Sequence, residues 1–375
     1  MAGPLRGVRV IELASIGPGP FAGMLLADAG ADVIRVERPR SDTLAAGPLL
    51  RGRRSITVDL QSPDGAAVVR RLASTADALF EGLRPGVTER LGVGPAACLA
   101  VNPQLVYGRM TGWGQSGPWA ERAGHDIDYI ALSGALHPIG PPDAPPPVPL
   151  NYVGDFGGGG MLLAFGLCAA LLHARATGEG QVVDAAMVDG AAAQTAMLHG
   201  MRTAQQWSDA RGDNLLDGAA PFYTTYETAD GKYLAIGALE PQFYAELLDR
   251  LGLDPAAWPQ HDRTQWPAQR ARLAEIFASR TRAAWEERFA TGDACVAPVL
   301  SPAEAPHHPH IATRGTLTEQ SGVIQPAPAP RFSSGAGPPP AGDDPGRAET
   351  TTTVLRSAGY TDEEIETLRE RGAIA

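Results

Sequence analysis

A histidine and an aspartate, each in a glycine-flanked loop, are the two side chains best suited to chemistry. His125 follows Gly124, and Asp155 follows Gly154 shortly before the four glycines at 157–160. Glycine beside a titratable residue lets backbone and ligand approach closely. An imidazole and a carboxylate that face one small volume can move a proton on and off a substrate. The alternative is structural: a hydrogen-bonded loop histidine, and an aspartate that caps the helix after the glycines.

Composition narrows the function classes. The chain has 375 residues, enough for two domains with sizeable cores, and 44% of them are hydrophobic. The 44 glycines and 33 prolines indicate abundant turns. A net charge of −11 argues against general nucleic-acid binding, which needs a positive footprint. It still permits a polyanionic ligand, because a few local arginines suffice for that.

Cysteine and histidine patterns do not indicate a metal. The three cysteines are far apart and form no CxxC pair. His307, His308 and His310 lie in a proline-broken stretch that is more typical of a surface loop than of a zinc site. The start shows no basic segment followed by an apolar run, as a signal peptide would. The apolar stretch at 160–173 is too short to span a bilayer, so no membrane is expected and the cytoplasm is the default location.

Alternating strand and helix patterns predict a parallel sheet with helical crossovers in the first half of the chain. The expected strands cover 8–13, 32–36, 78–81, 105–110 and 182–186. The expected helices cover 21–29, 63–74, 87–91, 157–175 and 188–206. The loop at 17–23 lies between a strand and a helix, but its prolines and spacing depart from GxGxxG, so a nicotinamide site there is only weakly indicated.

A second section reads as a small α+β domain. Alternating residues on both sides of Asp230-Gly231 predict a hairpin of 223–227 and 233–237. Helices are expected at 241–251, 266–279 and 283–291, a loop at 322–345, and a last helix at 361–371 with Thr361 as its N-cap. The expected boundaries are a large domain at 1–205 to which 335–375 returns, linkers at 206–220 and 311–334, and a small domain at 221–310.

Several sequence words occur together and resemble one family. They are GVRVIELA at 7–14, GPGP at 17–20, ADAGADVIRVE at 27–37, RPGV at 84–87, TGWGQSGP at 111–118, GEGQVVD at 178–184 and DACVAPV at 293–299. Together these resemble the family III coenzyme A transferases, over roughly residues 4–335, and within them the branch of α-methylacyl-CoA racemases. The resemblance implies a large Rossmann-like, doubly wound α/β domain, a small α+β domain, and an interlocked homodimer.

One position separates the branches of that family. The transferases usually carry an aromatic residue between the glycine and the first aspartate, and use the later aspartate as a nucleophile. Here that position is His125, as in the racemases, which pair the histidine with the later aspartate, here Asp155. The resemblance therefore implies proton transfer.

The resemblance also implies which residues hold the nucleotide end of coenzyme A. Arginine forks suit phosphate groups, although most arginines are solvated surface charges. The residues that match the family's contacts to adenosine, phosphates and pocket walls are Arg38, Val58, Asp59, Leu60, Gln61, Gly82, Leu83, Arg84, Arg90, Gly124, Asp126, Ile127, Asp128 and Tyr129.

Glu240 matches a glutamate of the small domain that, in the family, reaches the histidine. A carboxylate beside an imidazole fixes its tautomer and raises its pKa. The alternative is an ordinary acidic residue before Pro241 at the start of a helix. Asn151, Tyr152 and Tyr223 are expected to line the pocket, with ordinary loop packing as the alternative.

The reaction that the resemblance implies is inversion at the α-carbon of a 2-methylacyl-CoA. His125 and Asp155 are expected to act as the two bases, through an enolate, with no metal or further cofactor. Backbone N–H groups of 154–157 are candidate donors to the enolate oxygen. Two other functions stay open: CoA transfer with Asp155 as nucleophile, and coenzyme A binding without turnover.

Overall fold

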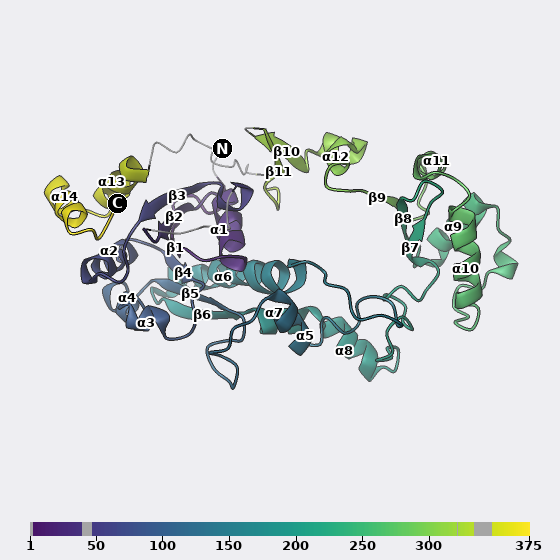
Figure 1. Cartoon of the computed structure of the whole chain (residues 1–375), viewed down its shortest axis with the longest axis horizontal. Coiled ribbons are helices and arrows are strands. Elements are labelled where there is room, and N and C mark those ends of the chain that lie inside the picture. The colour runs from purple at the N-terminus through teal and green to yellow at the C-terminus, as the bar shows by residue number, and fades with distance from the viewer. Residues whose placement is uncertain (1–2, 40–46, 321, 334–346) are drawn as a thin grey trace. The chain divides into compact units, whose positions relative to one another are not determined.

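The computed structural model describes residues 3–39, 47–320, 322–333 and 347–375. The chain divides into two compact units, which are described separately (Figure 1). The first unit comprises Met1–Ser133, Pro149–Thr195 and Thr318–Ala375, and the second comprises Gly134–Val148 and Ala196–Leu317. These units depart from the expected boundaries, because 134–148 and 196–220 group with the second unit.

A six-stranded parallel sheet forms the centre of the first unit, in the order β3-β2-β1-β4-β5-β6. Its strands are β1 (Arg9–Leu13), β2 (Asp32–Glu37), β3 (Arg53–Thr57), β4 (Ala78–Glu81), β5 (Val106–Thr111) and β6 (Gln181–Ala186). β3 was not expected, because this short edge strand begins with two arginines and lacks the apolar run that identified the other strands. The strand order confirms the doubly wound α/β class.

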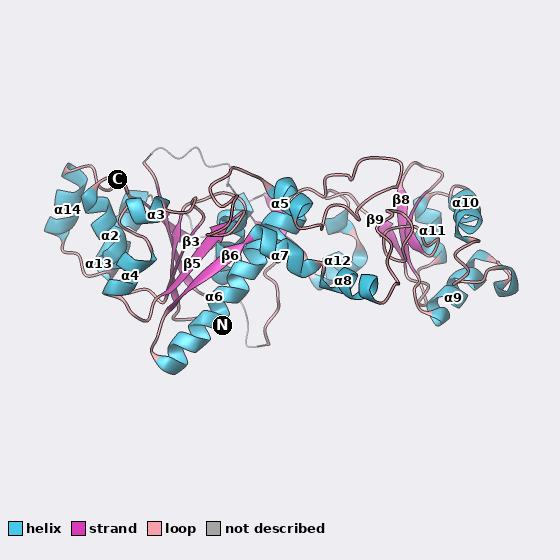
Figure 2. Cartoon of the chain, turned by 90° about the horizontal axis from the view of Figure 1, so that it is seen from below, coloured by secondary structure: helices cyan, strands magenta, loops and turns pink. Residues whose placement is uncertain are grey.

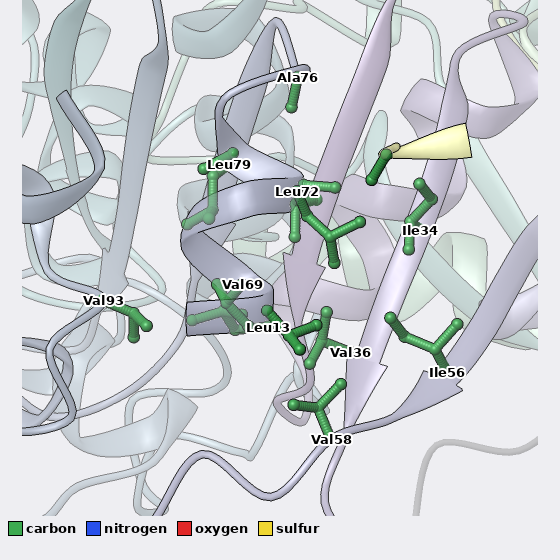
Figure 3. Close-up of a cluster of buried hydrophobic side chains, with 14 of the residues drawn as sticks. Leu13, Ile34, Val36, Ile56, Val58, Val69, Leu72, Ala76, Leu79 and Val93 are labelled. Carbon is green, nitrogen blue, oxygen red and sulfur yellow. The ribbon is translucent and has the colours of Figure 1, made fainter. Parts of the chain in front are cut away.

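Helices cover both faces of this sheet (Figure 2). One face packs against α1 (Pro18–Asp28) and α6 (Met161–Thr177), the other against α2 (Pro63–Ala73), α4 (Pro95–Val101), α13 (Arg347–Ser357) and α14 (Asp362–Glu370). Successive residues of a strand point to opposite faces, so Val10 joins the α1/α6 core and Ile11 the opposite one. Figure 3 shows the second of these cores, where Val69 and Leu72 of α2 lie over Leu13, Val36 and Ile56.

The order of the strands creates a crevice at one end of the sheet. β1 lies between β2 and β4, so the chain leaves β1 toward one side of the sheet and later returns on the other. Ligands of open α/β sheets bind in the crevice outside the carboxyl ends of the strands at such a switch point. The loops that follow Leu13, Glu81 and Thr111 therefore meet where a site is expected.

The glycine-rich segment 157–160 is helical, as expected, but it belongs to a π-helix that begins earlier than predicted. A π-helix, η2 (Tyr152–Gly160), runs directly into α6, so the helix begins five residues before its expected start at 157. The combined helix Tyr152–Thr177 has 26 residues, and an 18-residue stretch within it has a mean hydropathy of 1.6. By length and composition alone it could cross a membrane, which corrects the expectation that this stretch is too short. A core helix of a soluble protein meets the same criterion, so this is weak evidence.

Other short elements of the first unit also escaped the sequence analysis. They are η1 (Gly47–Leu50), α4, α5 (Asp126–Leu132), α13, and the strand pair β10 (Leu317–Gln320) and β11 (Val323–Pro326), which lies where a linker was expected. The expected helix at 87–91 is α3 (Val87–Arg90), and α14 has the expected capping box of Thr361 and Glu364. The expected helix 188–206 is two helices, α7 (Met187–Gln194) and α8 (Ala196–Thr203), separated at Thr195. The expected loop 322–345 lies partly outside the described residues.

The second unit packs helices against a three-stranded antiparallel sheet, β7-β8-β9. Its strands are β7 (Tyr223–Glu227), β8 (Tyr233–Gly237) and β9 (Val296–Val299), and its further helices are α9 (Pro241–Leu251), η3 (Pro255–Ala257), α10 (Trp266–Phe277), α11 (Arg282–Arg288), η4 (Ala305–His307) and α12 (Pro309–Arg314). The hairpin and its three long helices confirm the expected α+β pattern.

Candidate active site

His125 and Asp155 line the same cavity, which lies at the carboxyl ends of β1, β4 and β5. Its volume is about 500 Å³. The lining residues come from the first unit alone: Ile16, Gly17, Pro18, Gly82, Leu83, Arg84, Pro85, Met110, Thr111, Gly112, Trp113, Ala120, Arg122, Ala123, Gly124, His125, Tyr129, Asn151, Asp155 and Met187. His125 and Asp155, the two groups identified from the sequence, therefore lie at one cavity although they are about thirty residues apart in the chain.

Asp155 belongs to the first turn of η2 and is partly buried. Asn151 donates a side-chain hydrogen bond to its carboxylate over 3.3 Å. A side chain at Gly17 would begin only 2.9 Å from Oδ2 of Asp155, so glycine is needed there. Burial raises the pKa of Asp155, and the charge of Asp126 raises it further, whereas Asn151 and His125 lower it. These surroundings favour the protonated carboxyl more than water does, which suits a group that must also act as an acid.

His125 occupies the N-cap position of α5 and is exposed to the cavity. Its backbone N–H donates to the carboxylate of Asp128 over 2.9 Å, which fixes the start of the helix. Tyr129, one turn later, donates its hydroxyl to the carbonyl of Gly124 and stacks edge-on against Trp113 at 4.7 Å. Two residues of α5, Asp128 and Tyr129, therefore fix the backbone of His125 and Gly124.

Asp126 does not have the ligand-facing side chain that its expected role in coenzyme A binding suggests. The residue is 6% exposed, and its carboxylate accepts the backbone N–H of Asp155 over 2.6 Å. The backbone N–H of Phe156 donates to the carbonyl of Asn151. Two of the N–H groups expected to stabilise an enolate are thus already paired inside the protein, which corrects that expectation.

The residues expected to hold the nucleotide end fall into two places. Gly82, Leu83 and Arg84 line the reaction cavity, whereas Leu60, Gln61 and Arg90 line a separate pocket of about 290 Å³ beside α2. Arg38 is exposed at the end of β2.

Three further nucleotide candidates differ in their surroundings. The side chain of Val58 is buried in the core, the Asp59 carboxylate accepts the N–H of Gln61, and Ile127 is exposed on α5. Val58 as a whole residue is 0% exposed, so its expected contact with the nucleotide stays a prediction.

A buried carboxylate fixes the loop that carries Arg84. Glu81 ends β4, is fully buried, and accepts the backbone N–H of Leu83 over 2.6 Å. Arg109 donates to the same carboxylate over 3.3 Å. Burial raises the pKa of Glu81 to about 7, although both hydrogen bonds oppose this shift. Gly82 and Leu83 thereby acquire a defined backbone position at the cavity wall.

The other expected site residues divide between the two units. Asn151 lines the cavity, but Tyr152 is 61% exposed and is not among its lining residues. Tyr223 and Glu240 belong to the second unit, where Glu240 is the residue that precedes Pro241 at the start of α9. The role of Glu240 toward His125 remains a prediction.

Several lining residues were missed by the sequence analysis, among them Ile16, Met110, Trp113, Arg122 and Met187. Ile16, Met110 and Trp113 lie at or just after the carboxyl ends of β1 and β5, so the strand pattern could have identified them. Within the described part of the chain, no three His, Cys, Asp or Glu side chains are grouped to hold a metal ion.

Comparisons with known proteins agree with this geometry. The model of CoA-transferase family III matches residues 5–348. The chain is 47% identical to the α-methylacyl-CoA racemase of Mus musculus, over 96% of this chain and 95% of that protein. Identity to the α-methylacyl-CoA racemase of Homo sapiens is 45%, with the same coverage. Succinyl-CoA:glutarate CoA-transferase of Mus musculus is 33% identical over 90% of this chain and 83% of that protein. The crystal structure of a CAIB/BAIF family protein from Brucella suis aligns with a TM-score of 0.80 at 28% identity, covering 96% of this chain and 100% of that one.

Proposed function

The chain belongs to CoA-transferase family III, and from this premise we propose that it is a racemase that inverts the α-carbon of 2-methylacyl-CoA thioesters. The observation that carries the proposal is the shared cavity of His125 and Asp155. The α-methylacyl-CoA racemases of mouse and human, similar over nearly the whole chain, support the same substrate class.

The chemistry follows from the two bases. A thioester acidifies the proton on its α-carbon, so a neutral-pH base can remove it and leave an enolate. One of His125 and Asp155 removes the proton from one face of the α-carbon, and the other returns a proton to the opposite face. The two groups exchange roles when the reaction runs backward. Only protons move, so the proposed reaction needs no redox cofactor and no metal.

The nucleotide end of the substrate is proposed to bind outside the reaction cavity. Arg90 and Gln61 line the separate pocket beside α2, and Arg84 lines the cavity itself. Guanidinium groups pair well with phosphate oxygens. With Arg38 exposed at the end of β2, three arginines of the first unit are available for the phosphates of coenzyme A.

A homodimer is proposed, and α6 supports it. Phe165 and Leu172 of α6 are 71% and 72% exposed, and Met161 on the same helix is also exposed. Residues at this spacing share one face of a helix, and adjoining exposed apolar residues mark contact surfaces. A second copy of the chain is the occupant that this proposal assigns to the face.

The test uses a single 2-methylacyl-CoA in deuterated water, without any acceptor acid. A racemase incorporates deuterium at the α-carbon and equalises the two epimers under these conditions. Absence of exchange with either epimer, together with CoA transfer once a carboxylic acid is added, would identify a transferase instead. Binding of coenzyme A with neither reaction would leave a binding protein. A double variant, His125→Ala with Asp155→Asn, serves as the control for exchange that does not depend on the site.

A further inference from the structure

Asp126 connects the two elements that carry the proposed bases. It follows His125 directly and begins α5, while its side chain turns away from the cavity toward η2. Its Oδ2 accepts the backbone N–H of Asp155 over 2.6 Å, and the backbone N–H of Gly154 also favours its ionised form. The carboxylate of Asp126, the residue next to His125, therefore holds the helical turn that carries Asp155.

The surroundings of Asp126 show that this contact is specific. Burial raises the pKa of Asp126, and no cationic side chain pairs with it among the described residues. A side chain at Gly154 would begin 2.7 Å from Oδ2 of Asp126, so η2 approaches this closely only because residue 154 is glycine. A buried carboxylate without a cation is costly to maintain, and two backbone donors compensate for it only in part.

We propose that Asp126 is a positioning residue whose carboxylate fixes Asp155 relative to His125. The negative charge of Asp126 acts on the same neighbour, because it favours the protonated form of Asp155. This inference rests on the proposed proton transfer, but its physical content can be measured without it. Asp126 touches no reacting atom in this proposal and acts through Asp155.

The charged groups around Asp155 set the direction of the expected effect. Among the groups that raise the pKa of Asp155, Asp126 is second to burial, and His125 acts in the opposite direction. Tyr129 is the other titratable group of α5 that interacts with Asp155. Two further neighbours of Asp155 carry no charge. Gly17, just before α1, lies beside its carboxylate, and Gln194 of α7 donates to the nearby carbonyl of Val153. Removing the charge of Asp126 should therefore lower the pKa of Asp155.

The experiment compares Asp126→Asn with the unmodified protein. The pKa of Asp155 is measured by carbon-13 NMR of labelled aspartate carboxyls, with the signal assigned by its loss in Asp155→Asn. The introduced amide keeps the size of the side chain but removes its charge, and its neutral oxygen accepts the N–H of Asp155 less strongly than a carboxylate does. The expected result is a lower pKa for Asp155, and a kcat for α-proton exchange reduced about 10- to 100-fold with KM nearly unchanged.

Glu121→Gln is the matched control, because Glu121 is an exposed acid five residues away that should affect neither quantity. Asp126→Ser, which removes the same charge with a different shape, replaces the amide variant if that variant does not fold. An unchanged pKa of Asp155 in the folded variant would overturn the inference. A lowered pKa in a protein that shows no α-proton exchange would retain it and refute the proposed function instead.

Discussion

Asp155 and His125 face one cavity from different surroundings. Asp155 is partly buried beside a second carboxylate, and these conditions raise its pKa, whereas His125 is exposed at a helix N-terminus. A raised pKa lets a carboxyl group donate as well as accept a proton near neutral pH. Asp155 must be ionised when it acts as the base. Because its pKa is raised, the reaction that uses Asp155 as the base should be lost at a higher pH, as the pH falls, than it would be with an ordinary aspartate.

Removing the hydrogen bond from Asn151 should move the acidic limb of the pH–rate profile still further toward higher pH. The amide of Asn151 donates to the ionised carboxylate, and this contact lowers the pKa of Asp155. In Asn151→Ala the pKa should rise, so the acidic limb of the pH–rate profile should move to higher pH. The shift is opposite in sign to that expected for Asp126→Asn. A limb that stays in place would show that the contact does not form in solution.

The arginines should contribute to substrate binding and not to the chemical step. Arg84→Ala and Arg90→Ala should each raise KM while kcat stays within a few-fold, because phosphate contacts persist unchanged through proton transfer. Steady-state kinetics at two salt concentrations measure this. Arg175→Ala, at the exposed end of α6, is the control. Unchanged KM in both variants would place the coenzyme A site elsewhere.

At the scale of elements, the position of η2 depends on its contact with α7. A side chain at Gly190 of α7 would overlap the backbone carbonyl of Gly158 in η2. Gly190→Ala should therefore push α7 away from η2, lower the melting temperature and reduce kcat through displacement of Asp155. Gly200→Ala in α8 is the matched control, because nothing lies within 4 Å of the added methyl group. The control should be neutral, or more stable by about 0.5–1 kcal/mol. Equal melting temperatures for the two variants would contradict this packing.

Long periodic elements were predictable from the sequence, and the segments around the site were less so. Apolar runs identified β1, β2, β4 and β5, because strands buried on both faces are continuously apolar. β6 was also predicted, although it is an edge strand whose first residues are exposed. The helix that contains the four glycines was expected to begin at 157, and neither its start at Tyr152 nor its π-helical form was predicted. The structure makes these glycines a π-helix because neighbouring backbones pack where side chains would otherwise stand. The pairing of His125 with Asp155 was expected from resemblance, but the inward orientation of Asp126 requires tertiary contacts that no local pattern encodes.

At the scale of the whole molecule, Glu240 tests how the site is assembled. It lies in the second unit, whereas His125 and Asp155 lie in the first. If Glu240 from one copy serves His125 of another, a mixture of His125→Ala and Glu240→Gln chains should regain activity once subunits exchange. Each mixed dimer would then hold one site with both residues intact. No recovery, with subunit exchange shown by labelled chains, would mean that the residues of one site come from one chain.

The two-base scheme is tested most directly by following each epimer separately in Asp155→Asn and His125→Ala. Each pure epimer of a 2-methylacyl-CoA is incubated in deuterated water, and both deuterium incorporation and configuration are measured. A variant with one remaining base should exchange the α-proton of one epimer with retention and should not invert it. The account predicts that the two variants exchange opposite epimers. Exchange of the same epimer by both variants, or continued racemisation by either, would contradict the assignment of His125 and Asp155 to opposite faces.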